Sequence, residues 1–89
     1  MVRVVFAPAL QRHVELPPQT VAGVTLREVL DHALGDNPRA LRYILDDQRA
    51  LRHHMLIFID GVKIADRVKL SDAVKETSNV YVMQSLSGG

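Results

Sequence analysis

The chain has 89 residues and a mass of 9.9 kDa, enough for one small domain with a single core. Its 11 basic and 10 acidic residues nearly balance, so no excess of positive charge predicts nucleic-acid binding. The absence of cysteine excludes disulfides, thiolate metal sites and a cysteine nucleophile. The longest apolar run, residues 55–59, is too short to cross a membrane, and no signal segment opens the chain. We therefore expect a cytoplasmic domain that does not associate with membranes.

The N-terminal part predicts two paired strands. Residues 2–6 are rich in β-branched side chains and indicate a strand, and residues 8–12 turn the chain. Residues 13–16 then alternate polar and apolar side chains, as a half-buried strand does, and Pro17-Pro18 ends that strand. We expect an antiparallel hairpin here.

The first helix has the clearest local signals. Thr25 followed by Glu28 is typical of a capping box, and Gly35 stands where a left-handed C-terminal cap is expected. Between them apolar residues recur at helical spacing: Leu26, Val29, Leu30, Ala33 and Leu34. A shorter helix is predicted after Pro38, and residues 46–51 are predicted to form a loop.

The C-terminal half predicts mainly strands. Residues 55–59 indicate the strongest strand, the Asp60-Gly61 turn leads to a short partner at 62–64, and residues 80–83 form the last strand. Residues 70–74 are expected to make a single helical turn. The order predicts an α+β fold, a mixed sheet of four to five strands packed on one main helix. The expected domain covers residues 1–84, and residues 85–89 form a flexible tail.

The strand pattern also predicts a surface. If Val2, Val4 and Phe6 face the helix, the residues between them face away. The outward set is apolar: Val5, Ala7, Leu56, Phe58, Tyr81 and Met83. One helix covers only one face of a sheet, so this set favours an exposed patch that docks a partner. The alternative is that the second helix or a loop covers it.

No motif predicts a self-contained active site or a metal site. His53 and His54 are adjacent in a strand entry and point to opposite faces, so they are poorly placed to share an ion. Asp46-Asp47 is typical of a solvated turn, and His13 and His32 are isolated. We therefore expect no catalytic residues.

The sequence ends Leu86-Ser87-Gly88-Gly89, directly after the last predicted strand. Residues 84–89 reach about 20 Å when extended, and the two glycines have no Cβ to obstruct a narrow channel. Such a tail can present the Gly89 carboxylate to a partner's catalytic centre, where activation as an acyl-adenylate would make it transferable. A frayed end or an expression scar is the alternative.

With this ending the chain resembles the ThiS/MoaD-type β-grasp sulfur carriers, which are ubiquitin-like proteins. The resemblance spans nearly the whole chain and is carried by the opening residues 1–7, the Thr25 cap, the strand at 55–60 and the run from Val80 to Gly89. It implies that Gly89, with Gly88 beside it, carries sulfur. It implies three partners: an adenylating activating enzyme, a sulfur donor and a sulfur-acceptor synthase.

The resemblance further implies that this chain binds no cofactor, since ATP and magnesium belong to the activating enzyme. The outward apolar set, with Leu86, would dock on that enzyme. The middle segment 37–54 is closer to the molybdopterin and cysteine-pathway carriers than to the thiazole carriers.

Two features depart from the family pattern. Residues 76–79 replace a common Asp-Gly-Asp turn, and Gln84-Ser85 stand where many members have a proline. Two other functions stay open: a ubiquitin-like modifier conjugated through Gly89, and a plain β-grasp interaction module in which the two glycines are incidental.

Overall fold

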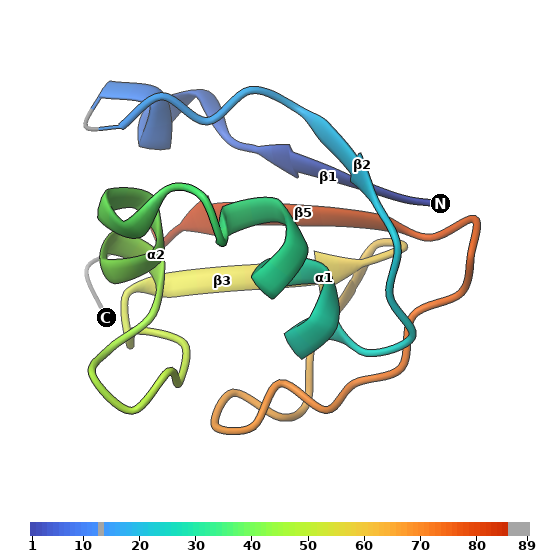
Figure 1. Ribbon diagram of the computed structural model, residues 1–89. Coiled ribbons are helices and arrows are strands. Elements are labelled where there is room, and N and C mark those ends of the chain that lie inside the picture. The colour runs from blue at the N-terminus through green and yellow to red at the C-terminus, as the bar shows by residue number, and fades with distance from the viewer. Residues whose placement is uncertain (13, 86–89) are drawn as a thin grey trace.

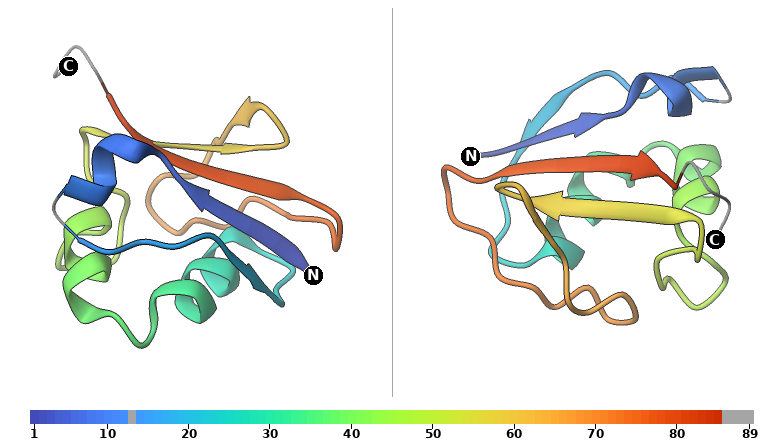
Figure 2. Two further views of the ribbon diagram at one scale, coloured as in Figure 1. Left: turned by 90° about the horizontal axis from the view of Figure 1, so that it is seen from above. Right: turned by 180° about the vertical axis from the view of Figure 1, so that it is seen from behind.

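Five strands form one mixed sheet, and two helices lie over one of its faces (Figures 1 and 2). The computed structural model describes residues 1–12 and 14–85. The elements in chain order are β1 (Val2–Phe6), the 3-10 helix η1 (Pro8–Arg12), β2 (Gln19–Val21), α1 (Leu26–Leu34), α2 (Pro38–Ile44), β3 (Met55–Ile59), β4 (Val62–Lys63) and β5 (Asn79–Gln84). This confirms the α+β expectation.

The strands are arranged in the order β2-β1-β5-β3-β4. The central pair, β1 and β5, is parallel, and the other three pairs are antiparallel. The last strand of the domain therefore lies in the middle of the sheet, between the first strand and β3.

The expected strand at residues 13–16 is wrong, because β2 begins only after the two prolines. Val14 and Leu16 are buried, as their spacing predicted, but they reach the core from an irregular segment. The Gln11 side chain explains why no strand forms at Leu16. Its amide nitrogen donates to the Leu16 carbonyl (2.6 Å), and its oxygen accepts from the Leu16 N–H (2.9 Å). A glutamine thus occupies the two backbone groups that a neighbouring strand would pair.

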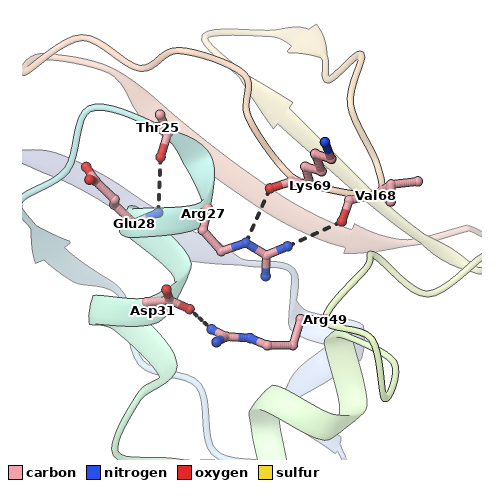
Figure 3. Close-up of polar contacts among 7 residues, drawn as sticks. All are labelled: Thr25, Arg27, Glu28, Asp31, Arg49, Val68 and Lys69. Atoms are coloured by element: carbon pink, nitrogen blue, oxygen red, sulfur yellow. Dashed lines mark hydrogen bonds and ion pairs between the residues drawn. The ribbon is translucent and has the colours of Figure 1, made fainter.

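Helix α1 begins as predicted and ends differently. The Glu28 N–H donates to Thr25 Oγ1 (3.3 Å; Figure 3), while the Glu28 carboxylate accepts from the Val24 N–H (2.9 Å). The expected left-handed cap at Gly35 is wrong, because its φ of −57° is right-handed. A Cβ there would lie 2.6 Å from the Asp31 carbonyl oxygen, so this glycine permits a close approach. The Asn37 side chain then caps α2 by accepting from the Ala40 N–H (3.2 Å).

The single helical turn expected at residues 70–74 is also wrong. Leu70 has a φ of 55°, which breaks any right-handed turn. Its carbonyl accepts from the Arg27 N–H (2.9 Å), so this segment completes the first turn of α1 instead. The Arg27 guanidinium donates to the Lys69 and Val68 carbonyls and ties the loop to the helix (Figure 3).

The core lies between the sheet and α1. Val2, Val4 and Phe6 are buried, as are Val80 and Val82, which confirms the predicted inward face. From α1 the predicted apolar stripe contributes Leu26, Val29, Leu30, Ala33 and Leu34, all buried. The main core of the protein therefore lies on one side of the sheet.

Candidate functional site: the outer face of the sheet and the end of the last strand

Apolar side chains form two rows across the outer face of the sheet. In the strand register Val5 stands beside Tyr81, and Tyr81 stands beside Phe58. Leu56 stands beside Met83 in the next row. Residues paired across neighbouring strands point to the same face, so these five side chains are contiguous. We call them the outer apolar face.

Neither helix covers the outer apolar face. Both helices lie on the opposite side of the sheet, as the view from behind shows (Figure 2). Tyr81 keeps 38% of its surface exposed, and the other four side chains are half-buried. The second helix therefore does not cover this patch.

Ala7 is the exception among the residues predicted to point outward. It is 7% exposed, so its expected place on an open surface is wrong. Its N–H donates to the Val82 carbonyl (2.9 Å), which extends the pairing of β1 with β5 by one residue. The 3-10 helix η1 begins at the next residue and packs against β5, so the strand pattern stops at this point.

Polar side chains flank the outer apolar face on both sides. Arg3 and Thr20 are paired in the register next to Val5, and Lys63 is paired with Phe58 on the other side. All three are exposed. An apolar centre with a charged border is the usual arrangement of a protein–protein docking surface.

The chain leaves the sheet from its centre. After β5 ends at Gln84, the Ser85 N–H donates to the His54 carbonyl (2.7 Å), which ties the start of the tail to the residue before β3. The predicted tail residues Leu86, Gly88 and Gly89 lie outside the described residues. Their assignment as docking and sulfur-carrying residues therefore stays a prediction.

The turn before β5 is held by an aspartate that the sequence identified only as a turn residue. Asp60 Oδ1 accepts from the Asn79 N–H (2.9 Å), and Oδ2 accepts from the hydroxyl of Ser78, a buried residue (2.9 Å). The Asn79 bond, followed by the Ser78 bond, lowers the pKa of Asp60 below its usual value. Asp60 thus links the β3–β4 hairpin to the start of β5, in the segment that departs from the family pattern.

The histidine and aspartate pairs lie in turns. Asp46 Oδ1 accepts from the Gln48 and Ala50 N–H groups (2.8 and 3.0 Å), which confirms a turn. His53 and His54 lie in the turn before β3. Within residues 1–12 and 14–85, no three His, Asp or Glu side chains are placed to hold a metal ion.

One feature escaped the sequence interpretation. A pocket of about 400 Å³ lies between η1 and α2, lined by Arg12, Val14, Arg39, Arg42 and Tyr43. Arg39 and Arg42 are three residues apart on α2, a spacing that places two side chains on one side of a helix. That spacing was the available signal. Nothing in the sequence indicated that Arg12, from a distant part of the chain, lines the same pocket.

No protein-family model matches the chain, and no curated protein does. Solved structures do match its fold. The small archaeal modifier protein SAMP1 of Haloferax volcanii has a TM-score of 0.75 at 20% identity over 99% of this chain and 98% of its own. SAMP1 of Methanosarcina acetivorans has a TM-score of 0.75 at 23% identity, over 99% of this chain and 95% of its own. The CysO of Amycolatopsis orientalis, solved as a BexX/CysO complex, has 0.78 at 16% identity over the full length of both.

These likenesses show the fold. The chain has the β-grasp fold expected from its resemblance to the ThiS/MoaD-type proteins, and its length is that of these neighbours. SAMP1 is a small archaeal modifier protein by name. No helix in the described part of the chain is long and apolar enough to span a membrane.

Proposed function

We propose that this chain is a sulfur carrier, a protein cosubstrate whose C-terminal Gly89 carboxylate is converted to a thiocarboxylate by partner enzymes. The observation that supports this most is the position of β5. It is the central strand of a β-grasp sheet, it carries Tyr81 and Met83 of the outer apolar face, and it leads directly toward residues 86–89. A surface for a partner and the start of the proposed reactive tail thus lie on one strand.

The proposed chemistry takes place in the partners. An oxygen of the Gly89 carboxylate attacks the α-phosphorus of ATP, pyrophosphate leaves, and an acyl-adenylate forms. Hydrosulfide then attacks the acyl carbon, and AMP leaves to give the thiocarboxylate. With a persulfide donor, the attack and the loss of AMP give an acyl disulfide, and a thiol cleaves its S–S bond to release the thiocarboxylate and a disulfide of the donor. Magnesium and ATP belong to the activating enzyme, so this chain needs no cofactor of its own.

The outer apolar face is the proposed docking surface for the activating enzyme. Its five side chains are large enough to provide a desolvated centre, and Arg3 and Lys63 are placed to select an acidic border on the partner. A sulfur-acceptor synthase would receive the thiocarboxylate afterwards. Its pathway, expected to be of the molybdopterin or cysteine type, stays a prediction, as does the cytoplasmic location.

Removing Gly89 tests the proposal. The truncated chain should unfold at the same urea concentration as the full chain, because the described helices and strands all lie within residues 2–84. It should no longer form an alkylatable thiocarboxylate in the native host. Tyr81→Asp should lower the yield of thiocarboxylate because it weakens docking on the activating enzyme. Val68→Asp, at an exposed valine outside the sheet, serves as the matched control. Full yield from the truncated chain would refute the proposal.

A protein modifier is the second candidate, and the names of the two SAMP1 neighbours favour it. It shares the activation step and differs in the acceptor, which is a target lysine. Lysine adducts in host extract that disappear when Gly89 is deleted would establish it. In a plain interaction module, partner binding would instead be unchanged by that deletion.

A further inference from the structure

Three arginines converge on one pocket at the end of the domain where β5 terminates. Arg12 is the last residue of η1, and Arg39 and Arg42 are one turn apart on α2. Together with Val14 and Tyr43 they line a volume of about 400 Å³. Figure 1 shows α2 at the end of the sheet toward which the arrow of β5 points.

The three guanidinium groups have no internal counterion in the part of the chain that the structure describes. The ion pairs found within residues 1–12 and 14–85 join Arg49 to Asp31 and the N-terminal amino group to Glu76. The whole chain carries a formal charge of only +1, so three positive charges around one concavity are a local concentration. An anion bound in this pocket would interact favourably with all three charges.

We propose that this pocket binds the phosphate group of a small phosphorylated molecule. Guanidinium groups match phosphate oxygens with two parallel hydrogen bonds each. Arginines that approach one concavity from two different elements suit a compact dianion with several oxygens. An acidic peptide, whose carboxylates are spread along an extended chain, fits this arrangement less well. The volume is within the range of small-molecule sites, about 300–1,000 Å³.

The pocket also has an apolar side for the rest of such a molecule. Val14 is buried, and Tyr43 packs partly against the core, so neither is a simple surface side chain. The phosphate would therefore be held by the arginines, and the remainder of the ligand would lie against an aliphatic and an aromatic wall.

A short chain of contacts joins the pocket to the start of the tail. The ring of Tyr43 meets the ring of His54 edge to face, with centroids 6.5 Å apart. The His54 carbonyl in turn accepts from the Ser85 N–H (2.7 Å). A ligand against Tyr43 is thus two contacts from the point where the chain leaves β5, and binding should be detectable at the Ser85 amide.

The test is an NMR titration of the full-length chain with inorganic pyrophosphate as the probe. We expect saturable amide shifts at the pocket residues and at Ser85, which weaken as salt is added. Arg39→Gln and Arg42→Gln should each raise the apparent Kd about tenfold, the effect of losing one charge-assisted contact. Lys69→Gln, which removes the same charge from an exposed residue of the 65–74 loop, should change it less than about twofold.

Three results would overturn the proposal: shifts that do not saturate, a Lys69→Gln effect equal to that of the arginine variants, or binding of an oligoglutamate peptide with none of pyrophosphate. The last would assign the pocket to an acidic protein segment. Deleting Gly89 should leave pyrophosphate binding unchanged. The inference therefore stands or fails separately from the proposed sulfur chemistry.

Discussion

Truncating two adjacent residues of β3 to alanine tests which face of the sheet is the core and which is free for a partner. Ile57 is 0% exposed and lies in the core, whereas its neighbour Phe58 is half-buried on the outer apolar face. Removing a fully buried isoleucine side chain costs about 2–5 kcal/mol, and we expect about 3.5 kcal/mol because Ile57 lies on a strand flanked on both sides. Phe58→Ala should lower the free energy of unfolding by about 1 kcal/mol, chiefly because alanine has a lower strand propensity than phenylalanine.

Urea unfolding followed by circular dichroism measures both costs. With an m value of about 1.5 kcal/mol/M, Ile57→Ala should lower the midpoint by about 2 M and Phe58→Ala by less than about 1 M. An unchanged m value in both variants serves as the control for an intact fold. If Phe58→Ala lowered the midpoint as much as Ile57→Ala, the outer apolar face would be packed like a core and would not be free to dock a partner.

Three further substitutions test particular contacts. Thr25→Ala removes the cap of α1, which costs about 1 kcal/mol, and should lower the Tm by about 4–8 °C; an equal loss in the exposed control Thr77→Ala would contradict the capping role. The Ser71 hydroxyl bond, with the Lys69 amide bond next, lowers the pKa of Asp66 from 3.8 to about 2. Between these values the unfolded chain binds more protons, so the free energy of unfolding should fall as the pH drops from about 4 to about 2. Asp66→Asn should flatten the dependence of the free energy of unfolding on pH, measured by acid titration. An unchanged slope would contradict the assignment of this dependence to Asp66. Gly61 has a φ of 85°, and a Cβ added there would meet no atom within 4 Å. Gly61→Ala should therefore destabilise the fold by about 1 kcal/mol through backbone strain alone. A raised melting temperature would contradict this expectation.

The parts of the fold that follow from local pattern were predictable from the sequence. The strand alternation in residues 2–6 and 55–58 and the capped apolar stripe of α1 appear as expected, because burial repeats with the period of each element, although Ile59, expected on the inner face, is only partly buried. Two of the errors, at residues 13–16 and 70–74, arise because the backbone makes hydrogen bonds other than those of the expected element. The Gln11 side chain bonds both backbone groups of Leu16 nearby in the chain, whereas the Leu70 carbonyl accepts from the distant Arg27 N–H, and neither residue type indicates its partner in the sequence.

The same distinction applies to the candidate site. The outer apolar face was predictable because alternation alone sorts the two faces of a strand, and Ala7 failed where the strand gives way to η1. The arginine pocket was not predictable, because it requires knowing that η1 folds back beside α2. Contacts between segments distant in the sequence are the information that the three-dimensional structure adds.

The most direct test of the proposed sulfur carrier is the intact mass of the protein from its native host, before and after treatment with a thiol-alkylating reagent. A thiocarboxylate adds about 16 mass units, as does one oxidised methionine, so mass alone is ambiguous. The chain has three methionines and no cysteine, and alkylation therefore distinguishes the two. We expect a single adduct on the peptide that ends in Gly89. An unmodified terminus, in cells where the activating enzyme and the sulfur donor are active, would contradict it.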